Sequence, residues 1–204
     1  MRARSAATGV VVGATALACA WGCTPKAQNG SAEAEPGKGG ATLTVTSTAF
    51  KDGDPIPAQF ACGVPRKDDC DLGTSPPLAW TAGPAQTKAY AVLVCDPDGH
   101  DWLHWVATDL PVSPTSLAQG ASGHCKSQLP AGAKDLKNEF DQAGYGGPCP
   151  PAGSGVHHYV FTVYALPTPG ISLPASTKCA DHKAVLESKA IARGSLTGTY
   201  RIDR

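Results

Sequence analysis

Residues 89–95 form an uninterrupted apolar run, and this run constrains the fold of the chain more strongly than any other segment. Apolar runs without polar alternation are typical of β-strands that are buried on both faces. The paired prolines Pro76 and Pro77 mark an edge strand or the entry to a strand, because proline cannot lie inside a central hydrogen-bonded ladder. The segments with strand character besides 89–95 are residues 43–48, 75–80, 104–110, 156–166 and 195–202.

One segment, residues 178–193, has convincing helical spacing, and Gly194 follows it as a helix-ending glycine. The chain also contains 23 glycines and 18 prolines, and its aromatic fraction is only 6%. This composition favours short strands joined by turns over a helical bundle. The sequence therefore predicts a mainly β fold, most simply an antiparallel β-sandwich with a C-terminal helix.

The N-terminus has the features of an export signal. Arg2 and Arg4 precede an apolar run at residues 6–20, as in secretory signal peptides. We expect lipid attachment at Cys23, which follows a small residue and precedes a polar segment; cleavage near Cys19 without lipid is the alternative. The expected organisation is a signal peptide at 1–22, a flexible tether at 23–41 and a folded domain at 42–204. These features predict an exported, membrane-anchored lipoprotein that faces the periplasm or the cell surface.

The number of cysteines supports export. Of the eight cysteines, Cys19 would leave with the signal and Cys23 would carry the lipid, so an even number remains in the domain, as disulfide pairing requires. No pair has the spacing of a zinc ribbon or a thioredoxin site, which disfavours a metal or redox role. Sequence alone does not fix the pairing, and the short Cys62–Cys70 loop is the first expectation for a bridge. The domain cysteines are Cys62, Cys70, Cys95, Cys125, Cys149 and Cys179.

The charge composition argues against a nucleic-acid partner. Lys+Arg and Asp+Glu each total 17, which gives a formal net charge of +0, and no local basic patch is present. Hydrophobic residues make up 42% of the chain, enough for a packed core.

Two polar clusters follow the buried run along the sequence. Asp96 and Asp98 follow it directly, and two carboxylates there would be costly to bury without partners. They therefore face solvent, bind a cation or an ammonium group, or orient a histidine; a simple turn is the alternative. His104 opens the next strand, where a neutral imidazole can donate from one nitrogen and accept at the other.

A third cluster is the loop at residues 144–151, which His157 follows. Its glycines allow a ligand to approach the backbone with N–H groups free to face an anion, and its prolines stiffen it. His157 could add a charge-assisted hydrogen bond. A rigid loop that caps the sandwich is the alternative reading of the same residues.

In this order, residues 75–80, Asp96-Pro97-Asp98, His104-Trp105-Val106, residues 144–151 and His157-x-Tyr159 resemble the signature motifs of the phosphatidylethanolamine-binding proteins. The resemblance is to their bacterial, Raf-kinase-inhibitor-like branch, and it covers residues 43–204. It implies a β-sandwich with a small pocket for phosphate-like anions and the phosphatidylethanolamine headgroup. The residues that match the pocket motifs are Asp96, Asp98, His104, Gly147, Pro148 and His157.

Two departures concern the rim of that pocket. Gly99 and His100 stand where the family usually continues with Ala-Pro, and His158 stands where an arginine is common. A remodelled rim with less fixed positive charge bears on headgroup selectivity more than on the anion site itself.

The leading functional hypothesis is a non-enzymatic binding protein for an anionic or phosphorylated small ligand, without a cofactor or a metal. An alternative is inhibition of a protein partner such as a protease, through the loop at residues 62–70 that carries Arg66 and Lys67. A second alternative is a metal-dependent hydrolase that uses Asp96, His104 and His157. A serine hydrolase is disfavoured because no G-x-S-x-G motif occurs and the serine of residues 153–155 is expected in a flexible segment.

Overall fold

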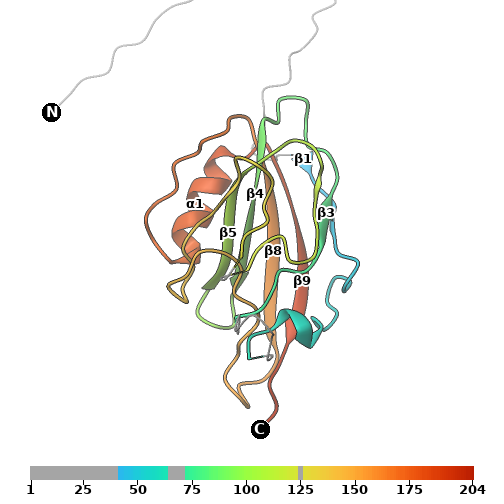
Figure 1. Ribbon diagram of the computed structural model, residues 1–204, viewed down its shortest axis with the longest axis vertical. Helices are drawn as coiled ribbons and strands as arrows, with labels where there is room; N and C mark the ends of the chain where they lie inside the picture. The colour runs from blue at the N-terminus through green and yellow to red at the C-terminus, as the bar shows by residue number, and fades with distance from the viewer. Residues whose placement is uncertain (1–40, 64–71, 124–125) are drawn as a thin grey trace, which may run out of the picture. The chain divides into compact units, whose positions relative to one another are not determined.

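The computed structural model describes residues 41–63, 72–123 and 126–204, which form two β-sheets and one α-helix (Figure 1). The larger sheet has the strand order β1-β9-β8-β4-β5-β7, and the smaller sheet has the order β2-β3-β6. All paired strands are antiparallel except β1, which runs parallel to β9. The elements are β1 (Ala41–Thr42), β2 (Val45–Thr46), η1 (Ala58–Phe60), β3 (Leu78–Trp80), β4 (Ala89–Asp96), β5 (Trp102–Leu110), β6 (Ser116–Leu117), β7 (Lys134–Asp135), β8 (His157–Leu166), α1 (Cys179–Lys189) and β9 (Ala192–Tyr200).

Strand β4 is buried along its whole length because each of its faces packs against a different layer. Tyr90 and Val92 point into the core between the two sheets, where they meet Trp80 of β3. Leu93 points to the opposite face, where Leu186 of α1 covers the larger sheet. Figure 1 shows α1 and β3 on opposite sides of β4. The prediction of a strand buried on both faces is therefore confirmed, as is the mainly β fold with a C-terminal helix.

Of the two readings of the paired prolines, the strand entry is confirmed and the edge strand is wrong, because β3 is the middle strand of the smaller sheet. Pro76 and Pro77 lie just before β3, so β3 can pair on both edges, with β2 on one side and β6 on the other. The clearest alternation of the sequence gives β8, in which Tyr159, Phe161 and Val163 are buried in the core between the sheets.

The C-terminal helix is shorter than the predicted segment at residues 178–193. It ends at Lys189, and its buried side chains are Cys179, His182 and Leu186. Gly194 does not end the helix but lies inside β9. A Cβ at Gly194 would overlap the backbone carbonyl of Leu43, so glycine is required there by close packing of two chain segments.

Two disulfides among the described residues tie distant segments together. Cys62 is bonded to Cys149 with Cα atoms 5.4 Å apart, and Cys95 is bonded to Cys179 with Cα atoms 6.1 Å apart. The expected Cys62–Cys70 bridge is therefore wrong, because the fold places the loop that carries Cys149 beside Cys62; Cys70 itself lies outside the described residues. The second disulfide joins the end of β4 to the start of α1, which holds the helix on the sheet.

Several expectations concern residues that the structure does not describe. These are the signal peptide, the tether up to residue 40, lipid attachment at Cys23, and Arg66 and Lys67 of the proposed inhibitory loop. Ala41, expected in the tether, is already part of β1 and pairs with Ala192 of β9. Among the described residues, no helix is both long enough and apolar enough to cross a membrane.

Candidate functional site

A cavity of about 640 Å³ opens at the end of the larger sheet where β4 terminates. Because β4 runs antiparallel to both β5 and β8, its last residue lies beside the first residues of those two strands. This topology brings together residues that are far apart in the sequence. The side chains that give the cavity its chemistry are Asp96, Asp98, His100, Trp102, His104, Phe140, Ser154 and His157.

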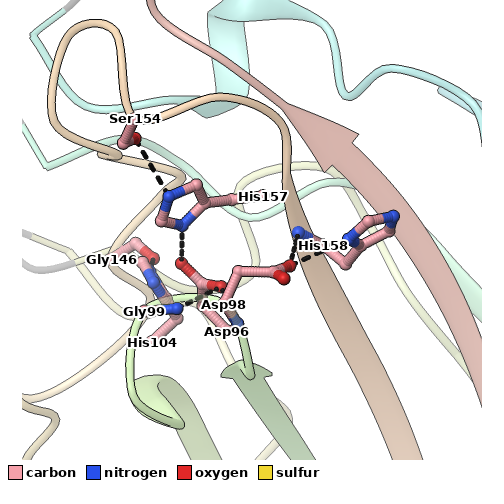
Figure 2. Close-up of polar contacts among 8 residues, drawn as sticks. All are labelled: Asp96, Asp98, Gly99, His104, Gly146, Ser154, His157 and His158. Carbon is pink, nitrogen blue, oxygen red and sulfur yellow. Dashed lines mark hydrogen bonds and ion pairs between the residues drawn. The ribbon is translucent and has the colours of Figure 1, made fainter.

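Asp96 and His157 form a buried pair at this cavity (Figure 2). The Oδ2 atom of Asp96 accepts a hydrogen bond from His157 Nδ1 at 2.7 Å, and only 3% of Asp96 and 7% of His157 are exposed. The other carboxylate oxygen, Oδ1, accepts from the backbone N–H groups of Asp98 and Gly99 at 2.9 and 3.0 Å. The turn after β4 therefore holds the carboxylate in place, and the carboxylate holds the imidazole. Of the roles expected for these aspartates, Asp96 has that of orienting a histidine.

The second nitrogen of that imidazole faces a serine. His157 Nε2 lies 3.0 Å from Ser154 Oγ, and both side chains line the cavity. The segment around Ser154 was expected to be flexible, but its backbone is tied into the domain. Gly153 N–H donates to the carbonyl of Ile202 at 2.9 Å, and Ser154 N–H donates to the carbonyl of Pro151 at 3.0 Å.

His104 is a buried, neutral histidine beside this pair. Burial lowers its pKa from an ordinary 6.5 to about 4. Its Nδ1–H donates to the carbonyl of Gly146 at 2.8 Å, which leaves Nε2 as an acceptor. The rings of Phe140 and Tyr159 meet the imidazole edge-on at centroid distances of 5.4 and 5.0 Å and hold it in place.

The rim of the cavity carries an exposed ion pair. Asp98 Oδ2 accepts from both the backbone N–H and the Nδ1 of His158, each at 2.8 Å. This pairing lowers the pKa of Asp98. His158 thus takes the place of the arginine expected in the family, and its ring points away from the cavity in Figure 2.

The same rim explains why Gly99 departs from the family pattern. A Cβ at residue 99 would lie 2.7 Å from Asp96 Oδ2, so this turn accepts only glycine without a shift. The two residues that follow, His100 and Asp101, have φ angles of 61° and 59°, a tight left-handed conformation that is uncommon outside glycine.

The loop at residues 144–151 was expected to offer free N–H groups to an anion, but its glycines have a structural role instead. Gly146 N–H donates to the carbonyl of His104 at 2.9 Å, and Gly147 N–H donates to the carbonyl of Leu72 at 2.6 Å. A Cβ at Gly147 would overlap the carbonyl of Phe60. These N–H groups are therefore not free to face an anion, and neither Gly147 nor Pro148 lines the cavity. The loop holds His104 in place through the hydrogen bonds of Gly146, and it packs against the η1 segment.

Of the predicted pocket residues, Asp96, Asp98, His104 and His157 do meet at one cavity. Sequence reasoning missed Ser154, Trp102 and Phe140. Ser154 lies three residues before His157 in the sequence. That spacing alone does not predict the contact, because it depends on the loop folding back onto the imidazole.

The described residues offer little support for a metal site at this cavity. Their one cluster with the spacing of metal ligands is Cys95, Asp101 and Cys179. Its two sulfur atoms are joined in a disulfide and are not free to ligate. The metal-dependent alternative therefore has no preassembled ligand set in the described part of the chain.

Comparison with known proteins gives relatives over most of the chain. The sequence is 37% identical over 166 residues to the UPF0098 protein YbcL of Escherichia coli, which covers 79% of this chain and 89% of that protein. It is 36% identical over 160 residues to "Putative lipoprotein LppC" of Mycobacterium tuberculosis, which covers 78% of this chain and 72% of the relative.

Solved structures agree with the sequence comparison. The crystal structure of Escherichia coli YbcL, described as a member of the mammalian PEBP family, superposes with a TM-score of 0.68 at 35% identity, covering 79% of this chain and 99% of that chain. A PEBP homologue from Chlamydia trachomatis, CT736, superposes with a TM-score of 0.63 at 31% identity and the same coverage. The family model described as phosphatidylethanolamine-binding protein matches residues 46–201. The chain therefore belongs to the phosphatidylethanolamine-binding protein family.

Proposed function

We propose that this protein is an exported binding protein whose cavity takes a phosphate-like anion or a phosphoethanolamine headgroup. The observation that carries the proposal is the buried Asp96–His157 pair at the cavity. With its Nδ1–H bonded to Asp96, a protonated His157 would donate its Nε2–H to a bound anion. The hydroxyl of Ser154 is a second donor at the same place.

His104 and Asp98 bear on which anions fit. A neutral His104 offers the lone pair of Nε2, which can accept a hydrogen bond from a protonated phosphate oxygen or from an ammonium group. Asp98 adds a negative charge at the rim, where an ammonium group would meet it. Trp102 and Phe140 contribute apolar surface that favours a headgroup over a fully hydrated ion. The combination suits a monoprotonated phosphate or a zwitterionic headgroup.

The proposed location follows from the N-terminal sequence. A signal peptide at residues 1–22 and a lipid on Cys23 would tether the domain to a membrane, facing the periplasm or the cell surface. The name of the relative from Mycobacterium tuberculosis, which includes the word lipoprotein, supports this assignment. A tether of this kind would keep the cavity near lipid headgroups and small phosphorylated molecules outside the cytoplasm.

Isothermal titration with inorganic phosphate and with phosphoethanolamine tests the proposal. The parent protein should bind at least one of these ligands, and His157→Ala should abolish the binding heat. His158→Ala is the matched control, because its imidazole is exposed and bonded to Asp98 and does not line the cavity. Absence of heat with both ligands, or equal binding by His157→Ala, would show that the cavity is not an anion site.

A further inference from the structure

We propose that Ser154, His157 and Asp96 form a nucleophilic triad that transfers acyl groups from small carboxylic esters bound in the same cavity. The three side chains form one hydrogen-bonded chain, with 3.0 Å between Ser154 Oγ and His157 Nε2 and 2.7 Å between His157 Nδ1 and Asp96 Oδ2 (Figure 2). These are the contacts by which a base activates a serine and a carboxylate orients the base. This activity goes beyond the binding function, and either can fail without the other.

Asp96 decides which atoms donate and which accept along these two hydrogen bonds. Its carboxylate accepts from two backbone N–H groups and can only accept from the imidazole, so Nδ1 of His157 carries the proton. Nε2 of the neutral ring is then the acceptor, and the hydroxyl of Ser154 donates to it. Asp96 is thus a positioning residue, whereas Ser154 and His157 would touch the reacting atoms.

Burial is graded along the triad in the order that catalysis needs. Asp96 is 3% exposed and His157 7% exposed, while Ser154 is exposed at the cavity wall. A buried carboxylate keeps its orientation, and an accessible hydroxyl can be reached by a substrate. A structural serine that only capped a histidine would not need this access.

The backbone around the serine holds it in one conformation. Gly153 and Gly155 flank it with φ angles of 78° and 99°, a left-handed conformation on both sides that glycine accepts without strain. The contact of Gly153 N–H with Ile202 pins the turn to the C-terminal tail. The G-x-S-x-G motif is absent, but a turn that presents the serine is present.

The backbone N–H next to the serine is a candidate donor for the developing oxyanion. The N–H of Gly155, the residue after the serine, donates no hydrogen bond within the described residues, and an N–H at this position commonly serves an oxyanion. A substrate carbonyl would take the place of water on this exposed N–H group.

The reaction balances without a cofactor. Ser154 Oγ bonds to the carbonyl carbon of the ester while its proton moves to His157 Nε2. The carbon–oxygen bond to the alcohol breaks, and the alcohol leaves with that proton. Water then attacks the acyl-serine, gives its proton to Nε2, and releases the carboxylic acid as the proton returns to Ser154. The apolar walls of Trp102 and Phe140 favour esters with small alkyl or aryl groups.

The test uses the purified protein with p-nitrophenyl acetate and with phenylmethylsulfonyl fluoride. The parent should hydrolyse the ester, and mass spectrometry should find the sulfonyl group on Ser154. Ser154→Ala should lower kcat/KM by at least about 100-fold, the lower end of what general-base activation contributes. Asp96→Asn, as a positioning change, should lower kcat with little change in KM. Ser188→Ala, an exposed serine on α1, is the matched control and should leave both readouts unchanged.

Three outcomes would overturn the triad. One is a folded parent protein in which Ser154 is not labelled and the ester is not hydrolysed. Another is hydrolysis that survives in Ser154→Ala but is lost in His157→Ala, because the nucleophile would then be water. The third is equal labelling of Ser154 in His157→Ala, which would mean that the serine is not activated. Phosphate titration of the same samples is independent, so loss of the triad and loss of the anion site are distinguishable.

Discussion

The free energy of unfolding should fall by about 3 kcal/mol less between neutral pH and pH 4 when His104 is replaced with Asn. Asn keeps an N–H group close to the position of Nδ1, so the hydrogen bond to the carbonyl of Gly146 is retained while the titrating ring is removed. Burial lowers the pKa of His104 in the native protein from 6.5 to about 4. Each tenfold change in proton affinity corresponds to about 1.4 kcal/mol, which gives about 3 kcal/mol for the whole difference.

The direction follows from proton uptake. Above pH 6.5 the imidazole is neutral in both the folded and the unfolded chain, and its full contribution to stability is present. As the pH falls from 6.5 toward about 4, the unfolded chain binds a proton that the native protein does not, and the free energy of unfolding decreases. Below about pH 4 the native protein is protonated too, and this loss stops growing.

Urea denaturation of the parent and of His104→Asn at a series of pH values between 4 and 7.5 measures the effect. The cavity left by Asn lowers the stability of the variant at every pH, but that cost cancels when each protein is compared with itself. The parent should lose about 3 kcal/mol more than the variant between neutral pH and pH 4. Parallel pH profiles would refute the reasoning, because they would mean that native His104 takes up its proton at an ordinary pH.

Three further changes test the packing and the rim. Gly147→Ala should lower the free energy of unfolding by about 1–3 kcal/mol, because its Cβ would overlap the carbonyl of Phe60, and an unchanged urea midpoint would contradict that packing. Replacing Cys95 and Cys179 together with Ala removes a cross-link between positions 84 residues apart, and calorimetry should show a loss of about 2–4 kcal/mol, whereas an unaltered Tm would argue against the disulfide. Asp98→Asn removes a negative charge at the cavity rim and should tighten phosphate binding severalfold at low salt, a gain that high salt should erase; weaker binding at low salt would be inconsistent with that role.

Much of the fold was predictable because strand patterns depend on near neighbours. The apolar run of β4 and the alternation of β8 identify buried strands whatever they pack against. The helix was harder, since its buried face is Cys179, His182 and Leu186, a mixture that only contact with the sheet explains. Gly194 was misread for the same reason: a glycine that ends a helix and a glycine that admits another backbone look alike in sequence.

The sequence by itself determined that this chain is a β-rich member of the phosphatidylethanolamine-binding protein family with carboxylates and histidines at a cavity, because ordered motifs and local periodicity survive without knowledge of contacts. Only the tertiary structure decided that Asp96 contacts His157 across a separation of 61 residues and that Ser154 lies within hydrogen-bond distance of the same imidazole. It also decided that the N–H of Gly147 is already occupied by Leu72. Hydrogen-bond partners and disulfide partners depend on which distant segments pack side by side, and local sequence does not encode that choice.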